Sequence, residues 1–367
     1  MKKPATILVA PLNWGLGHAT RCIPIVQELL RNKYRVIIAS DGEALDLLRK
    51  EFPDLQYYEL PGYKIKYGRN AIITRFKLLW QALSIKQAAG EEHNKLGALL
   101  KQEDIAGVIS DGRFGMHYTK ITSIYITHQL IVDTGWCSRL STWVHKRIMK
   151  NFTQIWVLDS PNEHSLAGKL SHNRSITHSK YIGAVSRFKI ASLPVKYSLL
   201  VLISGPEPQR SLFYDLIIRE LESYRQPVCI VRGRVEPVQE ITSINNRLTY
   251  NYATSTQINE LINSSNLVLC RSGYTTIMDL AKLNKKAFFI PTPGQGEQEY
   301  LATYLEATGI APYSSQKDFK LSLLNNIDHY KGFSEIPFST SSLEAAITAA
   351  FCRVKENSDP IPNSLST

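Results

Sequence analysis

Residues 267–279 read Leu-Val-Leu-Cys-Arg-Ser-Gly-Tyr-Thr-Thr-Ile-Met-Asp, and this stretch decides the fold expected for the chain. The apolar run at its start predicts a buried parallel strand, and the small residues around Gly273 predict a tight turn. A helix is then expected to begin near Thr275. A helix that starts directly after a strand offers free backbone N–H groups and a positive dipole end, which together form a site for phosphate. Asp279 would lie one to two turns into this helix, within reach of sugar hydroxyls.

A second stretch, Pro-Thr-Pro-Gly-Gln-Gly-Glu-Gln-Glu at residues 291–299, follows another apolar strand at 287–290. It places amide and carboxylate groups near a strand end, where ligands of open α/β sheets bind. The two stretches together predict a nucleotide-sugar pocket. Their candidate donor-binding residues are Arg271, Ser272, Gly273, Thr275, Asp279, Glu297, Gln298 and Glu299.

Strands and helices alternate along the 367 residues, which predicts an α/β protein of two Rossmann-like, doubly wound domains facing a cleft. The first domain is expected at residues 1–187 and the second at 198–340, with a linker at 188–197 between them. A last helix is expected at 341–354, and its return to the first domain is left open. The Asn-, Ser- and Pro-rich tail at 355–367 should be disordered.

Composition narrows the class of protein. No stretch of about 18 apolar residues is present, so no transmembrane helix is expected. The chain leads from its first residues straight into a strand, so no signal peptide is expected either. Five scattered cysteines indicate a reducing compartment and show neither a disulfide framework nor zinc spacing. We therefore expect a cytoplasmic protein.

The net charge of +11 is unevenly placed, with 25 Lys and Arg against 15 Asp and Glu in residues 1–180, and 18 against 17 in the remainder. Residues 62–90 are basic and aromatic, with no acid from Pro61 to Gly90. Such a segment can lie on an anionic bilayer surface, or it can be a long helix that packs on a sheet. The chain shows no nucleic-acid-binding motif, so a nucleic-acid partner is not expected.

The loop Gly15-Leu16-Gly17-His18 separates the first predicted strand from the first predicted helix. Its glycines nearly match the dinucleotide fingerprint, and Asp41 lies where a ribose-binding acid would be, so a nicotinamide- or flavin-dependent enzyme is one alternative. Thr20 replaces the third glycine of that fingerprint. His18 favours a different chemistry, because a histidine at a helix N-terminus loses proton affinity to the dipole and suits a general base. A loop histidine that caps its own turn is the simpler alternative.

Two more side chains follow predicted strands of the first domain. Asp111 comes after the strand at 105–109 and could orient His18, bind an acceptor, or cap a turn before Gly112. His128 follows the strand at 121–126 and could line an acceptor pocket or be a buried, satisfied histidine.

These motifs resemble those of glycosyltransferases with the GT-B fold, nearest the family 28 branch that contains the peptidoglycan N-acetylglucosaminyltransferase. Cys270 to Gly273 resembles the family's donor motif, and the family's ribose-binding acid falls on Asp279. Its paired sugar-binding glutamines fall on Gln298 and Glu299, so the second is changed. The glycine loop with His18 is similar to the family's Gly-Gly-His loop, and Thr127-His128-Gln129 resembles its His-Glu-Gln-Asn turn, with the His kept. Residues 181–187 resemble the segment that joins its two domains.

The resemblance implies an inverting, metal-independent hexosyltransferase that uses a UDP-sugar as donor substrate and needs no cofactor. No Asp-x-Asp sequence is present to hold a divalent ion between phosphates. The acceptor would be a hydroxyl, for example of a lipid or cell-envelope glycan, which suits peripheral attachment to the inner membrane face. Further donor-side candidates are Gly17, Ser204, Gly205, the cation of Arg232 or Arg271, and, by resemblance only, Thr254 and Ser255 near the base. A structural hydrogen-bonding role for Arg271 stays equally open.

Two other functions remain open at this point. A nucleotide-sugar epimerase on the same scaffold would need carboxylates around the sugar, which Glu297 and Glu299 could supply. A non-catalytic nucleotide-sugar-binding protein would have no need of His18.

Overall fold

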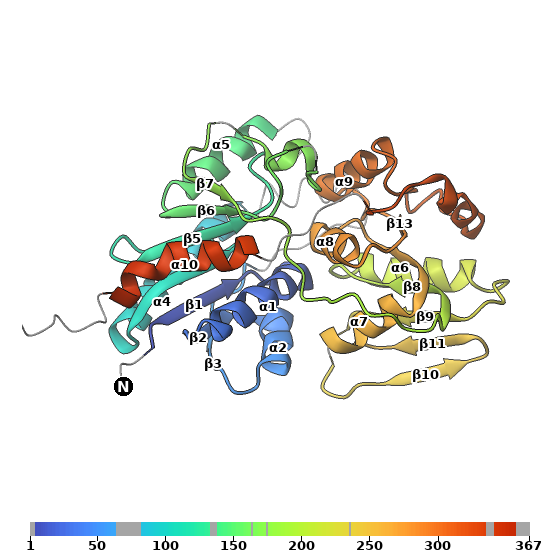
Figure 1. Cartoon of the computed structure of the whole chain (residues 1–367), viewed down its shortest axis with the longest axis horizontal. Coiled ribbons are helices and arrows are strands. Elements are labelled where there is room, and N and C mark those ends of the chain that lie inside the picture. The colour runs from blue at the N-terminus through green and yellow to red at the C-terminus, as the bar shows by residue number, and fades with distance from the viewer. Residues whose placement is uncertain are drawn as a thin grey trace, which may run out of the picture.

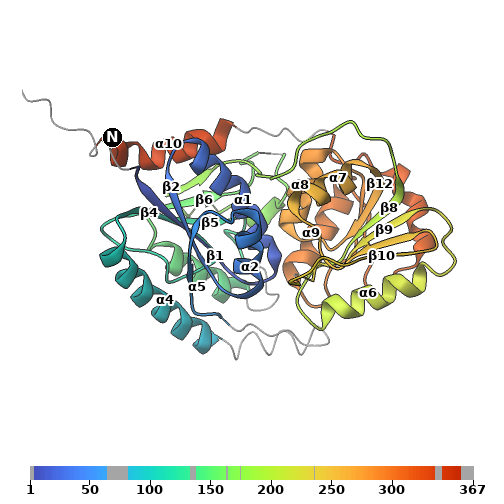
Figure 2. The ribbon, with the colours of Figure 1, turned by 90° about the horizontal axis from the view of Figure 1, so that it is seen from below.

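The computed structural model describes residues 4–63, 82–132, 138–162, 164–173, 175–234, 236–334 and 341–356. The chain forms two lobes, each built around its own sheet (Figures 1 and 2). Most of the basic, aromatic segment expected to contact either a bilayer or the sheet, residues 64–81, lies outside the described residues, as does the tail from residue 357 onward.

The first lobe contains a seven-stranded sheet in the order β3-β2-β1-β4-β5-β6-β7, in which every neighbouring pair is parallel. Strand β1 is buried along its whole length, as expected for an apolar run covered on both faces. The strands are β1 (Thr6–Pro11), β2 (Arg35–Ser40), β3 (Gln56–Glu59), β4 (Ile105–Asp111), β5 (Thr122–Thr127), β6 (Gln154–Val157) and β7 (Ser179–Tyr181). The helices are α1 (Leu16–Arg31), α2 (Gly42–Glu51), α4 (Ala82–Gln102), α5 (Ser138–Met149) and the 3₁₀ helix η2 (Gly168–Ser171).

The second lobe contains a six-stranded sheet in the order β10-β11-β9-β8-β12-β13, parallel except for the edge hairpin of β10 and β11. Its strands are β8 (Tyr197–Leu202), β9 (Val228–Val231), β10 (Ile241–Ile244), β11 (Arg247–Tyr250), β12 (Ser265–Cys270) and β13 (Ala287–Phe289). Its helices are α6 (Gln209–Glu220), α7 (Ser255–Asn263), α8 (Tyr274–Leu283), α9 (Gly296–Ala307) and the 3₁₀ helix η3 (Leu321–His329).

Strand order places the functional loops. In each sheet the order reverses beside the first strand of the lobe, between β1 and β4 and between β8 and β12. Ligands of doubly wound sheets bind outside the carboxyl ends of the strands at such switch points. Strand β4 ends at Asp111, and strand β12 ends at Cys270, directly before the predicted phosphate turn. The candidate residue Asp111 and the phosphate turn therefore each lie at a switch point. The expected pair of Rossmann-like, doubly wound sheets is confirmed.

Helix α10 (Ser341–Glu356) follows the second lobe in the sequence and packs on the first (Figures 1 and 2). The Phe351 ring lies edge-on to Tyr34, with the ring centroids 6.0 Å apart, and fills the space beside Gly107 of β4. At the other end of the helix, the Ser342 hydroxyl donates to the carbonyl oxygen of Ile182 at 2.5 Å. These contacts all lie in the first lobe, so the last helix crosses back to it from the second.

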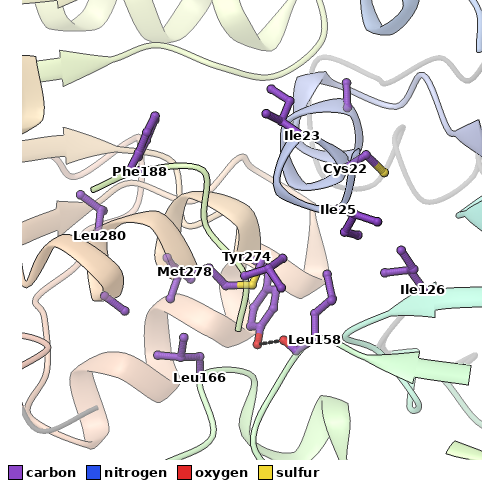
Figure 3. Close-up of a cluster of buried hydrophobic side chains, with 14 of the residues drawn as sticks. Cys22, Ile23, Ile25, Ile126, Leu158, Leu166, Phe188, Tyr274, Met278 and Leu280 are labelled. Carbon is purple, nitrogen blue, oxygen red and sulfur yellow. Dashed lines mark hydrogen bonds between the residues drawn. The ribbon is translucent and has the colours of Figure 1, made fainter. Parts of the chain in front are cut away.

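The two lobes share one apolar cluster (Figure 3). Cys22 and Ile126 come from the first lobe, and Met278 and Leu280 come from the second. Within this cluster the Tyr274 hydroxyl of α8 donates to the carbonyl oxygen of Leu158, 2.5 Å away. Helices α1 and α8, one from each lobe, also contact each other.

Candidate functional site

A cavity of about 1860 Å³ lies between the two lobes and is lined by loops at the carboxyl ends of both sheets. The predicted cleft between the two Rossmann-like domains is therefore present. The predicted site residues that line it are Gly17, His18, His128, Ser204, Gly205, Ser255, Gly273, Thr275, Asp279, Glu297 and Gln298.

His18 occupies the third position of α1, directly after the turn at Gly15, whose φ of 73° favours glycine. Its Nδ1 atom lies 2.8 Å from Oδ1 of Asp111, the last residue of β4. Asp111 is fully buried and does not line the cavity, so it contacts the histidine and not a bound acceptor. The neighbouring positions of β1 and β4 in the sheet explain how residues 93 positions apart meet.

Arg21 contacts both His18 and Asp111. It was not among the residues predicted from the sequence. It lies one helical turn after His18 and is 5% exposed. Its Nε and Nη2 atoms bind the two oxygens of the Asp111 carboxylate, and Nη2 also lies 2.9 Å from Nδ1 of His18. The one available signal was the spacing His-x-x-Arg, which places both side chains on one helix face.

Burial and charge set the ionisation of this group. Burial, followed by the positive charge of Arg21, lowers the pKa of His18 below its ordinary value of 6.5, although Asp111 acts in the opposite direction. Burial would raise the pKa of Asp111, but Arg21 and His18 outweigh it and hold that pKa well below its usual range. A neutral imidazole beside a carboxylate results, and this is the state that a general base requires.

On the opposite wall, α8 begins at Tyr274 after Gly273, so its first-turn N–H groups belong to the predicted phosphate turn. The Thr275 hydroxyl donates to the carbonyl oxygen of Gly17 at 3.1 Å. The first turns of α1 and α8 thus meet across the cleft. Two positive dipole ends that converge in this way favour an anion between them.

Asp279 lies further along α8, is 6% exposed and still reaches the cavity lining. The Ser186 hydroxyl, from the segment that joins the lobes, donates to its Oδ1 at 2.6 Å. Burial raises the pKa of Asp279 to about 6, although Arg187 and Ser186 act to lower it. Arg187 also lines the cavity, and sequence reasoning gave it no role beyond the joining segment.

Two donor-side predictions need correction. Arg271 does not line the cavity: its guanidinium is buried, donates to the carbonyl oxygens of Ile290, Pro291 and Gln209, and stacks over the Phe213 ring at 4.0 Å. Arg271 therefore has the structural hydrogen-bonding role that was left open for it. A guanidinium held by these three carbonyl oxygens does not reach a diphosphate in the cavity. Thr254 also lies outside the lining, since its hydroxyl caps helix α7 by accepting from the N–H of Gln257.

Three further predicted residues, Ser272, Glu299 and Arg232, are not part of the cavity lining. The Ser272 hydroxyl donates to the Gln298 carbonyl oxygen at 2.7 Å, and Glu299 accepts from the N–H of Gly294 at 2.7 Å. The guanidinium of Arg232 lies over the Tyr214 ring at 4.5 Å. Ser272 and Glu299 support the donor loops, so their predicted direct contacts are corrected to supporting roles. The direct donor contact expected from Arg232 stays a prediction. With Glu299 turned to its own loop, the epimerase alternative loses one of its two carboxylates.

Ser255 and Glu51 join the lobes at another point on the cavity wall. The backbone N–H and hydroxyl of Ser255 both bind the Glu51 carboxylate, the N–H at 3.1 Å. Ser255 thus connects the second lobe to Glu51 of the first lobe. Its expected position beside the nucleobase stays a prediction.

The acceptor-side wall contains His128, whose ring stacks on Tyr274 with centroids 4.1 Å apart and planes 5° apart. Its Nε2 atom lies 2.7 Å from Oε1 of Glu297 in the other lobe. His128 is thus both buried and part of the cavity wall, which joins the two alternatives left open for it. The wall beyond it is mostly apolar and aromatic and includes Trp14, Phe114, Val132, Leu140, Trp143 and Val144.

The dinucleotide alternative fails on geometry. The expected ribose-binding acid, Asp41, is bound by Arg113 and by Nδ2 of Asn13, the latter at 3.2 Å. A Cβ atom at Gly17 would lie 3.3 Å from Oγ1 of Thr275, so the second lobe contacts the glycine loop at this residue. Gly17 therefore lies both at the contact between the lobes and on the cavity lining.

Within the described residues, no three His, Cys, Asp or Glu side chains gather as a metal site would require. A search of the same residues finds no helix with the length and apolar character needed to span a membrane.

Comparison with known proteins agrees with this geometry. Residues 217–350 match the model of the glycosyltransferase family 28 C-terminal domain. The chain is 23% identical over 337 residues to the UDP-N-acetylglucosamine–N-acetylmuramyl-(pentapeptide) pyrophosphoryl-undecaprenol N-acetylglucosamine transferase of Haemophilus ducreyi, with 85% of each protein covered. It is 39% identical over 64 residues to the protein of that description from Actinobacillus pleuropneumoniae serotype 5b, which covers 17% of this chain and 18% of that protein.

Solved structures show the same architecture. The spinosyn rhamnosyltransferase SpnG has a TM-score of 0.63 at 16% identity, with 96% of this chain and all (100%) of that chain covered. MurG of Acinetobacter baumannii has a TM-score of 0.51 at 13% identity, with 99% and 97% covered. Residues 217–350 match a family 28 domain and the whole chain adopts the GT-B fold, so this protein is a glycosyltransferase that resembles those of family 28.

Proposed function

We propose that the protein transfers a sugar from a UDP-sugar to an acceptor hydroxyl with inversion at the anomeric carbon and without a metal ion. The observation that carries this proposal is the pairing of His18 with Asp111 on one wall of the cavity, opposite the start of α8 on the other. A base and an anion site that face each other across one cleft suit a direct displacement, in which nucleophile and leaving group lie on opposite sides of the sugar.

His18 would act as the general base. Its Nδ1–H donates to Asp111, which leaves the lone pair of Nε2 to take the proton of the acceptor hydroxyl. The acceptor oxygen then bonds to the anomeric carbon while the bond from that carbon to the diphosphate oxygen breaks. The acceptor proton ends on His18, and the electron pair of the broken bond leaves with UDP.

The leaving diphosphate would lie at the converging first turns of α1 and α8. Backbone N–H groups after Gly273, the hydroxyl of Thr275 and the loop at Ser204 and Gly205 line this part of the cavity. Fixed dipoles of this kind stabilise a developing negative charge without reorganisation. Asp279 is the candidate partner for the ribose hydroxyls. Uridine is proposed because the relatives from Haemophilus ducreyi and Actinobacillus pleuropneumoniae are named for transfer from UDP-N-acetylglucosamine.

For the acceptor, we propose a hydroxyl carried by a lipid-linked molecule, reached by a cytoplasmic protein bound to an anionic bilayer surface. Helix α5 supports this proposal, because Leu140, Trp143 and Val144 are 60%, 57% and 43% exposed on one face and also line the cavity. Arg139 and Arg147 are exposed on the same helix. An apolar stripe flanked by cations is the pattern of a helix that binds an anionic bilayer surface.

The donor is tested by thermal unfolding with UDP, UDP-glucose, UDP-N-acetylglucosamine, UDP-galactose or NAD added, since a ligand that binds the folded state raises its apparent stability. We expect stabilisation by UDP and at least one UDP-sugar, followed by release of UDP from that sugar. Stabilisation by NAD without UDP would overturn the proposal. Conversion of a UDP-sugar to its epimer without UDP release would show the epimerase instead.

The membrane surface is tested with vesicles of phosphatidylglycerol and of phosphatidylcholine. We expect the wild type to sediment with the anionic vesicles and a Leu140→Ser, Trp143→Ser double variant to stay in solution. The control is Val238→Ser, Ile241→Ser, which removes equally exposed apolar side chains from the second lobe. Equal sedimentation of wild type and the α5 variant would exclude α5 as the binding surface.

A further inference from the structure

We infer that Arg21 is a positioning residue that couples the base on the acceptor side to the loop on the donor side, by holding Asp111, His18 and His128 at once. The inference deepens the proposed function, because it names a residue that sets the geometry of both halves of the same site. The contacts that carry it are independent of which sugar or acceptor is used.

The first half of the argument is the fork that Arg21 makes with Asp111. Both side chains are buried, and the two carboxylate oxygens are bound by Nε and Nη2 of one guanidinium. A bidentate pair of this kind fixes the direction of the carboxylate as well as its charge. Because Asp111 also contacts Nδ1 of His18, the fork fixes the plane in which the base can lie.

The second half is the proton on His128. A guanidinium only donates hydrogen bonds, and Nη1 of Arg21 lies 3.2 Å from Nδ1 of His128. Nδ1 of His18 also has the Asp111 carboxylate beside it as an acceptor, whereas Nδ1 of His128 faces Arg21 alone among the described residues. Nδ1 of His128 therefore accepts, which places its ring hydrogen on Nε2. That hydrogen points at Oε1 of Glu297, 2.7 Å away in helix α9 of the second lobe.

The arrangement continues across the cleft. The stack of His128 on Tyr274 fixes the ring plane, so the histidine can serve Arg21 and Glu297 only in this one tautomer. Burial would raise the pKa of Glu297, but His128 and Arg21 hold it at about 2, so the carboxylate is ionised and accepts. Asp111, Arg21, His128 and Glu297 thus form one hydrogen-bonded chain between the strand end behind the base and the donor loop.

A lysine at position 21 could not hold Asp111 and His128 at the same time. One ammonium group is a point charge on a flexible stem, whereas the guanidinium presents a planar fork that reaches Asp111 and His128 simultaneously. Arg21→Met removes the charge and keeps much of the length, and Arg21→Lys keeps the charge without the fork. The matched control is Arg31→Met on the same helix, because Arg31 is 73% exposed and pairs with Glu28, three residues before it.

The first experiment reads the tautomer directly and needs no substrate. Long-range ¹H–¹⁵N NMR of protein labelled in histidine distinguishes a protonated ring nitrogen from an unprotonated one, and His128→Asn assigns the signals. We expect hydrogen on Nε2 and none on Nδ1 of His128 in the wild type and in Arg31→Met, and an exchanging mixture in Arg21→Met. A wild-type His128 protonated on Nδ1, or an Arg21→Met spectrum identical to wild type, would overturn the inference.

The second experiment separates positioning from folding. We measure UDP affinity by calorimetry and UDP release from the UDP-sugar that the wild type turns over. Because a misplacement of about 1 Å can cost about 100-fold in rate, we expect kcat to fall about 100-fold in both Arg21→Met and Arg21→Lys, with UDP affinity retained. Full activity in Arg21→Lys would show that charge alone suffices and would overturn the positioning role.

A double variant tests the coupling across the cleft. If Arg21 acts through His128 and Glu297, the rate losses of Arg21→Met and Glu297→Gln should be smaller together than their product. Losses that simply multiply would contradict the coupling. If the wild type itself releases no UDP from any UDP-sugar, the proposed function fails, and the NMR experiment still decides whether Arg21 sets the tautomer of His128.

Discussion

The Thr275 hydroxyl of α8 donates to the carbonyl oxygen of Gly17 in the first turn of α1, across a distance of 3.1 Å. This contact brings the starts of two helices from different lobes together at the cavity. Because each start carries a partial positive charge, the arrangement is favourable once an anion lies between them.

Thr275→Val tests this anion site. To bind the diphosphate, the Thr275 hydroxyl must turn from the Gly17 carbonyl oxygen and donate to a phosphate oxygen, so the net gain is a charged hydrogen bond less a neutral one. Removing this hydroxyl should therefore weaken UDP binding by about 10-fold. The free energy of unfolding should fall by only about 1 kcal/mol, because the lost contact with Gly17 is a neutral hydrogen bond. Calorimetry with UDP measures the first effect and urea unfolding the second. Thr308→Val, at the far end of α9, is the control, and equal UDP affinity in both variants would place the diphosphate elsewhere.

The pH dependence of kcat/KM tests His18 as the base. Only the neutral ring can accept a proton, and burial and Arg21 lower its pKa below 6.5. Activity should therefore persist below pH 6.5 and decline only as the pH falls through the lowered pKa. An acid limb with its midpoint above pH 6.5 would contradict this assignment.

Asp279→Asn should change stability and binding in opposite directions. Burial raises the pKa of Asp279 to about 6, so its favourable contribution is complete below the unfolded value near 4 and is lost as the pH rises through 6. Relative to wild type, the variant should gain stability between pH 4.5 and pH 8, because the amide stays neutral and still accepts from Ser186. Its UDP affinity should fall. Urea unfolding at both pH values measures the difference, and a difference independent of pH would refute the raised pKa.

Arg271→Met should unfold more easily without losing affinity for UDP. The substitution leaves the carbonyl oxygens of Ile290, Pro291 and Gln209 without their donor, which we expect to cost about 3 kcal/mol or more. Urea unfolding and UDP calorimetry on the remaining folded protein separate the two effects. A loss of UDP affinity at unchanged stability would restore the direct donor role that the structure removes.

The strands and turns that could be predicted from the sequence are those marked by neighbouring residues in the chain. Apolar strands ending in small residues placed His18, Asp111 and Gly273 at strand ends, and the rules for doubly wound sheets brought those ends to switch points. The cavity contains most of the predicted donor residues for this reason. The hairpin of β10 and β11 was missed, although Asn245 and Asn246 form a two-residue turn signal, because its four-residue strands are exposed or half-buried and carry little apolar pattern.

Side-chain direction could not be predicted in the same way. Arg271 and Ser272 adjoin the phosphate turn in sequence, yet Arg271 donates to the Pro291 carbonyl oxygen and Ser272 to the Gln298 carbonyl oxygen. Arg21 was missed for the opposite reason, since its partners Asp111 and His128 lie 90 and 107 residues away. Contacts that cross between strand ends, or between lobes, have no counterpart in local spacing.

The central claim is that His18 does chemistry on a donor held by the other lobe. The most direct measurement compares UDP affinity and UDP release from a UDP-sugar in wild type and His18→Ala. We predict that UDP affinity stays within a few-fold while turnover falls by about 100- to 10,000-fold, as expected when a general base is removed. Turnover at the wild-type rate in His18→Ala, with UDP still bound, would contradict the account.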